Sequence, residues 1–165
     1  MKYTTKIALI ASLSIVLALS TSYVVIEKQA TVAKTDAGFD YSLDLVNKER
    51  SANNLKPLNW NEDLVKSASD KLDDMFANQY FDHISKDGTT AWKFVLAEGY
   101  DYKYAGENLG IDYRNVDEVF DAWKKSPTHY ENIMSDKFNE YGFAQKEGVY
   151  EGTNTIMFVQ IFASK

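Results

Sequence analysis

The spacing of hydrophobic residues changes partway along this chain, and that change fixes the order of its elements. Up to about residue 125, the apolar positions recur three or four residues apart, which is the spacing of one helix face. From residue 141 they form short runs over 141–144 and 155–162, which are typical of strands. Helices first and strands last predict an α+β domain, in which helices pack on a small antiparallel sheet.

Helix-capping residues and helix breakers set the predicted boundaries. Asn61 and Asn115 are good N-caps, and Thr89 or Thr90 can serve the same role between them. Pro127 prevents the last long helix from continuing. The predicted helices cover about 42–52, 61–78, 90–99 and 115–125, with one further helical turn over 130–134.

The segments between these elements are predicted as loops. Residues 100–112 are a tyrosine-rich loop, and residues 146–153, which contain two glycines, connect the two strands of a hairpin. A short extended piece over 55–60 follows the first helix, because proline pushes its predecessor out of helical space. The three tryptophans lie at or near helix boundaries within apolar stripes and are expected to pack in the core: Trp60, Trp92 and Trp123.

The first 26 residues have the pattern of a segment that directs export. Lys2 and Lys6 precede a run over 7–26 that contains no charged residue. A basic start followed by an apolar run is typical of a signal peptide, and 20 uncharged residues could also span a bilayer as an uncleaved anchor. Residues 27–38 are then a polar linker, and residues 39–165 are the folded domain. The protein is therefore expected outside the cell or at its surface, with membrane contact only through the N-terminal segment.

Charge and cysteine content exclude several classes of function. All 24 acidic residues lie at Glu27 or later, and two of the 18 basic residues precede it, so the rest of the chain carries a formal net charge of −8. So acidic a domain, with dispersed basic residues, argues against nucleic acid as a partner. The chain has no cysteine, so the sequence offers neither a disulfide framework nor a thiol nucleophile.

The two histidines of the chain are the strongest candidates for a functional site. His83 and His129 each follow a predicted helix end, and Glu107 lies between them in a Gly-Glu-Asn element. Two imidazoles and a carboxylate are the ligand count of a zinc site with an open position for water. Without metal, Glu107 could instead hold one histidine as imidazolium. Each histidine could also be an ordinary surface residue, and Glu107 could accept backbone N–H groups in a tight loop.

Motifs spread over the domain resemble the CAP superfamily, also called the SCP/PR-1 domain, and in particular its short bacterial branch. Any one of these motifs is weak alone, but in the right order over one domain they are strong, and the match extends from about residue 41 to residue 163. They are Val46–Arg50 in the opening helix, Leu55–Asn61, Phe81–His83 with Asp87-Gly88, Tyr104–Leu109 with its Gly-Glu-Asn, Ala122–Met134 with its Trp, Ser-Pro, His and Asn-Ile, and the closing segments 141–144 and 159–162.

The resemblance implies an α-β-α sandwich with a central cleft, which two histidines and two glutamates line and where zinc or calcium can bind. His83, Glu107 and His129 match three of these four positions. The fourth glutamate is not matched, because Ser126 falls in that region; Glu131 is a candidate substitute. Asn108 and Asn132 are expected to be hydrogen bonders rather than ligands.

The sequence therefore predicts an exported binding protein whose cleft holds a divalent cation, a small apolar ligand, a lipid or a cell-wall component. A metal-dependent, peptidase-like hydrolase with Glu107 as its base is the alternative, and a structural envelope protein with a vestigial cleft is a third. Binding is favoured over catalysis because the sequence contains no nucleophile elbow and no His-Glu-x-x-His helix.

Overall fold

The computed structural model describes residues 41–165. The predicted leader or anchor over 1–26 and the predicted linker over 27–38 lie outside these residues. Within the described part of the chain, no helix is long and apolar enough to cross a membrane.

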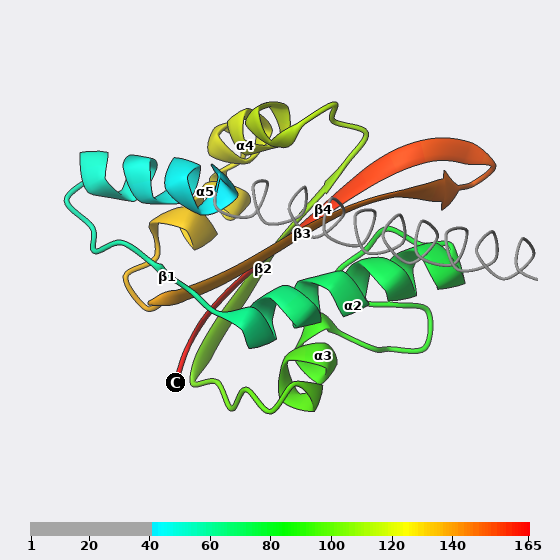
Figure 1. The fold of residues 1–165 in the computed structure, drawn as a ribbon, viewed down its shortest axis with the longest axis horizontal. Coiled ribbons are helices and arrows are strands. Elements are labelled where there is room, and N and C mark those ends of the chain that lie inside the picture. Colours follow the sequence, from blue (N-terminus) through cyan, green and yellow to red (C-terminus); the bar gives the residue numbers. More distant parts are fainter. Residues whose placement is uncertain (1–40) are drawn as a thin grey trace, which may run out of the picture. The chain divides into compact units, whose positions relative to one another are not determined.

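Five helices and four strands make up the described part of the chain (Figure 1). The helices are 41–52, α2 (Glu62–Asn78), α3 (Ala91–Ala97), α4 (Val116–Lys125) and α5 (Pro127–Met134). The strands are β1 (Asn59–Trp60), β2 (Tyr104–Ile111), β3 (Glu140–Tyr150) and β4 (Thr153–Ser164).

The predicted N-caps of α2 and α4 are confirmed. The Asn61 side chain accepts hydrogen bonds from the backbone N–H groups of Asp63 and Leu64 at the start of α2. The Asn115 side chain accepts one from the backbone N–H of Glu118, 3.0 Å away, at the start of α4. These bonds satisfy amide groups that have no partner inside the helix, so both helices begin where the sequence predicts.

The strands form one mixed sheet in the order β1-β3-β4-β2. Strand β4 pairs antiparallel with both β3 and β2, as expected. The short β1 pairs parallel with β3, because Asn59 lies opposite Glu140 and Trp60 opposite Tyr141. The sheet is therefore antiparallel, as predicted, except at this edge, where the extended piece after the first helix joins it in parallel.

Alternate residues of β4 face two separate hydrophobic cores. Met157, Val159 and Ile161 belong to the core that α2 and α3 cover. Phe158 and Phe162 belong to the core that the helix over 41–52, α4 and α5 cover. Since successive side chains of a strand point to opposite faces, one central strand supports both layers of an α-β-α sandwich (Figure 1).

Two connecting segments differ from the prediction. Most of the predicted tyrosine-rich loop is strand β2. Two of its residues are glycines, which the packing of neighbouring side chains requires, so the strand lacks the regular apolar alternation by which strands are recognised. The hairpin connection is not 146–153 but the two residues 151–152, because pairing continues to Tyr150 and Thr153. The third helix spans Ala91–Ala97 with Glu98 as its C-cap, and Gly99, at a φ of +78°, ends it as predicted; its Leu96 side chain is 52% exposed.

The segment after Pro127 also differs from the prediction. Helix α4 does end before the proline, but α5 begins at Pro127 itself and runs to Met134. Proline lacks an N–H group and has a helical φ, so it fits the first turn of a new helix. His129 therefore lies on a helix and not in a loop after one.

Candidate functional site

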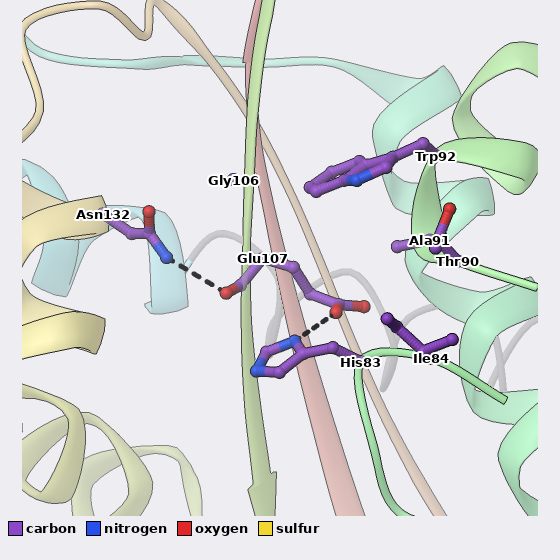
Figure 2. A pocket seen from close by; sticks show the side chains of 8 residues that line it. All are labelled: His83, Ile84, Thr90, Ala91, Trp92, Gly106, Glu107 and Asn132. Atoms are coloured by element: carbon purple, nitrogen blue, oxygen red, sulfur yellow. Dashed lines mark hydrogen bonds and ion pairs between the residues drawn. The ribbon is translucent and has the colours of Figure 1, made fainter. Parts of the chain in front are cut away.

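A cavity of about 360 Å³ opens between the outer strand β2 and the segment that joins α2 to α3 (Figure 2). Its wall contains both polar and apolar side chains. The residues that matter for its chemistry are His83, Ile84, Trp92, Gly106, Glu107 and Asn132.

Glu107 forms the polar floor of this cavity. It lies on β2 opposite Ile161 of β4, and on a strand it shares a face with Leu109 and the core beneath α2 and α3. Its side chain is 3% exposed. One carboxylate oxygen, Oε2, lies 2.6 Å from Nδ1 of His83. The other, Oε1, is the single buried side-chain N or O atom in the described residues that has no hydrogen-bond partner.

His83 reaches Glu107 from the loop that follows α2. An ionised carboxylate only accepts hydrogen bonds, so Nδ1 of His83 carries the proton and Nε2 remains for a ligand. The hydrogen bond to Glu107 raises the pKa of His83, although partial burial of the ring lowers it in opposition. The two residues thus form a hydrogen-bonded pair at one side of the cavity, as Figure 2 shows.

Lys71 holds the loop that carries His83 in place, and this residue was not identified from the sequence. Its side chain is fully buried in α2. Its ammonium group donates to the backbone carbonyls of Asp82 and His83, at 2.8 and 3.2 Å, and to the Tyr80 hydroxyl at 3.1 Å. Burial lowers the pKa of Lys71, and the charge of Glu107 is the largest influence that raises it. The signal was present: a lysine at the centre of the apolar stripe of α2, between Ala68 and Met75.

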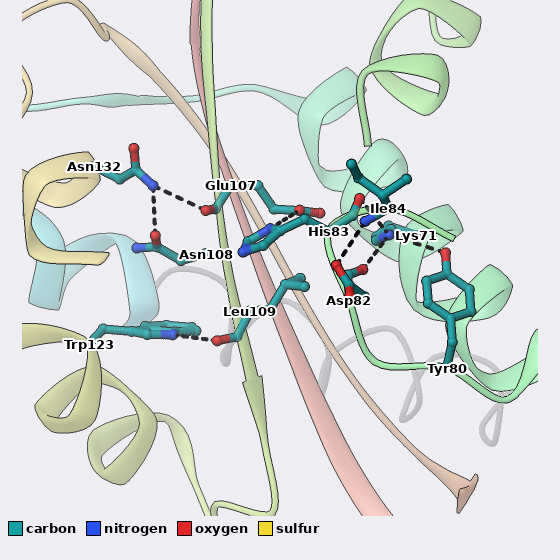
Figure 3. Close-up of polar contacts among 10 residues, drawn as sticks. All are labelled: Lys71, Tyr80, Asp82, His83, Ile84, Glu107, Asn108, Leu109, Trp123 and Asn132. Atoms are coloured by element: carbon teal, nitrogen blue, oxygen red, sulfur yellow. Dashed lines mark hydrogen bonds and ion pairs between the residues drawn. The ribbon is translucent and has the colours of Figure 1, made fainter. Parts of the chain in front are cut away.

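Asn132 and Asn108 brace the opposite side of β2 (Figure 3). The Asn132 amide donates to the Glu107 carbonyl at 3.0 Å and to Oδ1 of Asn108 at 2.8 Å. Asn108 donates to the backbone carbonyl of His129 at 3.1 Å and to Gln160 at 3.0 Å. Both asparagines are hydrogen bonders, as expected, but they tie a strand to α5 rather than bracing a loop.

His129 does not join the pair of His83 and Glu107. It lies on α5 and is not among the residues that line the cavity. Burial lowers its pKa, and the charge of His83 lowers it further, so the two imidazoles are near enough to interact electrostatically. Between residues 41 and 165, no group of three or more histidine, aspartate and glutamate side chains is arranged to hold a metal ion.

Ser126 and Glu131, the auxiliary candidates besides Asn108, also lie apart from the cavity. Ser126 separates α4 from α5, and its hydroxyl lies 3.3 Å from that of Thr128. Glu131 is exposed on α5. Neither side chain lines the cavity.

The residues at the cavity therefore do not fit a zinc or calcium site. Zinc sites use at least three protein ligands, and calcium takes six to eight oxygens. Here the described residues bring together two candidate ligands, His83 and Glu107, and place the Lys71 ammonium beneath them. What the geometry offers is one buried carboxylate oxygen that lacks a donor.

Comparison with known proteins shows the family of this domain. A family model described as CAP, the cysteine-rich secretory protein family, matches residues 43–162. The uncharacterized protein YkwD of Bacillus subtilis (strain 168) is 37% identical over 105 residues, which are 64% of this chain and 41% of YkwD.

Solved structures show the same architecture. The crystal structure of an extracellular protein containing a SCP domain from Bacillus anthracis str. Ames has a TM-score of 0.68 and 26% identity, over 79% of this chain and 41% of that chain. An outer surface protein from Borrelia burgdorferi has a TM-score of 0.65 and 22% identity, over 73% of this chain and 86% of that chain. The similarity therefore spans less than half the length of YkwD and of the Bacillus anthracis protein.

Proposed function

This chain belongs to the CAP family, and from that premise we propose that it is an exported binding protein whose cavity over Glu107 takes a small molecule from the cell envelope. The observation that carries the proposal is the unpartnered Oε1 of Glu107 at a buried position in the cavity. A buried polar atom without a partner is destabilising. A ligand that donates a hydrogen bond to this oxygen would remove that penalty, so this is where binding energy is available.

The opposite wall of the cavity suits an apolar or sugar-ring surface. Ile84 is 55% exposed beside the cavity, and Trp92 lies across from Glu107 (Figure 2). The Trp92 ring is held against Tyr102, with ring centroids 5.9 Å apart. Aromatic rings held in this way offer a large contact area at low entropic cost. The ligand class we propose thus combines a hydrogen-bond donor with an apolar face, as fragments of cell-wall polymers and some lipids do.

Export of the protein is part of this proposal. The basic start and the uncharged run over 7–26 support it. The Bacillus anthracis relative is described as an extracellular protein. A ligand from the envelope is the class that a protein outside the cell would meet.

The metal-dependent hydrolase remains a prediction of the sequence. It requires a metal held by His83, Glu107 and His129, and the described residues do not assemble these three. A carboxylate that binds a metal would also not be free to act as a base. No observation at the cavity therefore favours catalysis over binding.

The proposal can be tested with soluble murein fragments as the probe, followed by ligand-observed NMR or calorimetry. Glu107→Gln puts an amide donor where a carboxylate oxygen stood, and we expect about tenfold weaker binding, since a hydrogen bond to a charged group contributes about 1.5 kcal/mol or more. Trp92→Ala should weaken binding through lost contact area. Leu96→Ala, on the exposed side of the same helix, is the matched control and should bind as the unchanged protein does.

Two results would count against the proposal. Binding that survives both Glu107→Gln and Trp92→Ala would place the ligand elsewhere on the surface. A melting temperature that rises with zinc or calcium, and not with murein fragments, would favour the metal site that the sequence predicts, provided that His83→Ala removes the rise.

A further inference from the structure

Two opposite charges are buried on the same face of the sheet, and the proposed function uses only one of them. Of the described residues, three charged side chains are buried: Arg50, Lys71 and Glu107. Arg50 belongs to the other face, where its guanidinium holds the end of α5 through the carbonyls of Ile133 and Ser135. Lys71 and Glu107 are therefore the buried charges beneath the cavity, and a buried charge is costly unless another charge or hydrogen bonds compensate it.

The hydrogen bonds of Lys71 fix its position. An ammonium group has three donors, and the Tyr80 hydroxyl and the carbonyls of Asp82 and His83 accept all three. Each of these acceptors is neutral, so no carboxylate touches the ammonium directly. The two carbonyls belong to the loop that carries His83, so the same ammonium also sets the position of the imidazole that touches Glu107 (Figure 3).

The carboxylates near Lys71 differ in their exposure. Asp82 is exposed, and Asp74 is half-buried and accepts a hydrogen bond from the Tyr80 hydroxyl. Glu107 is buried and has one oxygen free. Among these three, solvent screens Glu107 least, so its attraction for the ammonium is the least weakened.

We propose that the Lys71 ammonium is the internal counter-charge of Glu107, and that it makes the cavity select an uncharged hydrogen-bond donor over a divalent cation. The proposal rests on the proposed function, because it names the charge of the ligand that the same cavity takes. The Lys71–Glu107 pair has no net charge. A divalent cation at Oε1 would be repelled by the ammonium, whereas a hydroxyl or amide donor would not. All three donors of Lys71 are already used, so the ligand meets only the acceptor.

The first test compares cation binding by the unliganded full-length protein and two lysine variants, with zinc and calcium alone as probes in calorimetry. Lys71→Met removes the buried charge at similar side-chain length. Lys66→Met is the matched control, because Lys66 lies on the same helix with its side chain 62% exposed. We expect weak or no binding by the unchanged protein and by Lys66→Met, and at least tenfold tighter binding by Lys71→Met. Tight binding by the unchanged protein that Glu107→Gln abolishes would overturn the proposal.

The second test measures the coupling of the two charges without any ligand. Each single variant, Lys71→Met and Glu107→Gln, leaves one buried charge without its partner, so both should unfold at a lower urea concentration than the unchanged protein. The double variant should unfold at a higher urea concentration than either single variant. Additive losses would overturn the proposal, and so would a double variant that does not fold. Should Lys71→Met alone fail to fold, a folded double variant would support the pairing. Because this cycle needs no ligand, its outcome is separate from the murein-fragment test of the proposed function.

Discussion

At the scale of single residues, the two histidines lie in environments that shift their pKa values in opposite directions. His83 shares a hydrogen bond with Glu107, and this bond raises its pKa. The His129 ring, which has no such carboxylate partner within the described residues, has its pKa lowered by burial. The chain has two histidines, so their ring signals can be told apart with single substitutions.

NMR titration should therefore show two separated imidazole curves. We expect His83 to titrate above its ordinary value of 6.5 and His129 to titrate below it. Spectra of His129→Gln would assign the remaining signal to His83. A His129 signal that titrates above that of His83 would contradict the arrangement described for the pair.

The same shifts predict opposite effects of pH on stability. The raised pKa of His83 means that its contribution is fully present below pH 6.5 and is lost as the pH rises through the raised value. The lowered pKa of His129 means that its contribution is present above pH 6.5 and is lost as the pH falls through the lowered value. Urea midpoints of His83→Gln and His129→Gln, measured from about pH 5 to 8, should diverge in opposite directions from those of the unchanged protein.

The sequence could identify part of the site at this scale. Glu107 and His83 were predicted together, and the structure pairs them. Lys71 was missed, because a lysine in a helix is usually exposed and its partners, the carbonyls of Asp82 and His83, carry no side-chain signal. That His129 does not line the cavity could not be predicted, because it depends on how α5 packs against β2.

At the scale of elements, the packing of strand β2 against α5 depends on one amide side chain. The Asn132 amide donates to a backbone carbonyl of β2 and to Asn108, and from Asn108 hydrogen bonds continue through Gln160 and Tyr141 to Ser42. Because each member of this chain of polar groups has a partner, the network fixes one register between the layers.

Asn132→Ala should consequently lower the free energy of unfolding by about 1–3 kcal/mol, because it leaves buried acceptors unpaired. Urea denaturation measures the change. Asn78→Ala is the control, since its exposed side chain bonds only to Asp74 one turn earlier. Equal losses in the two variants would show that the network contributes no more than a surface hydrogen bond.

Helix α2 approaches β3 so closely at Gly142 that no side chain fits between them. A Cβ atom at this position would lie 2.3 Å from the Leu64 carbonyl carbon and 2.5 Å from the Val65 nitrogen. Both are backbone atoms, which cannot rotate away. Gly142→Ala should therefore cost about 3 kcal/mol or more in the free energy of unfolding.

The hairpin glycine provides the contrast to Gly142. Gly152 has a φ of +80° and open space around it. Gly152→Ala should cost only the left-handed backbone penalty, about 1–2 kcal/mol. Thermal unfolding of both variants tests this order, and a larger loss for Gly152→Ala would mean that α2 can shift away from β3.

The elements differ in how well the sequence could predict them. Helix starts were predictable at Asn61 and Asn115 because a cap is a local interaction. Strand β2 was not predictable, because Gly106 and Gly110 resemble loop residues in sequence. Both glycines are required by close contacts with distant side chains. Gly106 packs against Asn132 and Phe138, and Gly110 packs against Val119 and Trp123. The parallel direction of β1 could not be predicted either, because it depends on pairing with residues 140–141, which lie far along the chain.

At the scale of the whole domain, the two cores share one strand and should unfold together. Ile161 and Phe158 lie on opposite faces of β4, each fully buried. Because both cores contain side chains of β4, a substitution that destabilises one core should also destabilise the other.

Ile161→Ala and Phe158→Ala should therefore each cost about 2–5 kcal/mol and still give a single transition. Circular dichroism and tryptophan fluorescence should report the same midpoint, since Trp92 and Trp123 lie in different cores. Two separate midpoints in either variant would show that the layers fold independently.

The outer side of β2 has a consequence for how a peptide could meet this domain. The Glu107 carbonyl already accepts a hydrogen bond from Asn132, and the Leu109 carbonyl accepts one from the Trp123 indole at 2.8 Å. A polypeptide that tried to extend the sheet as a fifth strand would have to displace both donors. A binding partner at this sheet edge should therefore insert a protruding group into the cavity rather than pair as a strand. The occupied carbonyls also disfavour edge-to-edge pairing between copies of the domain.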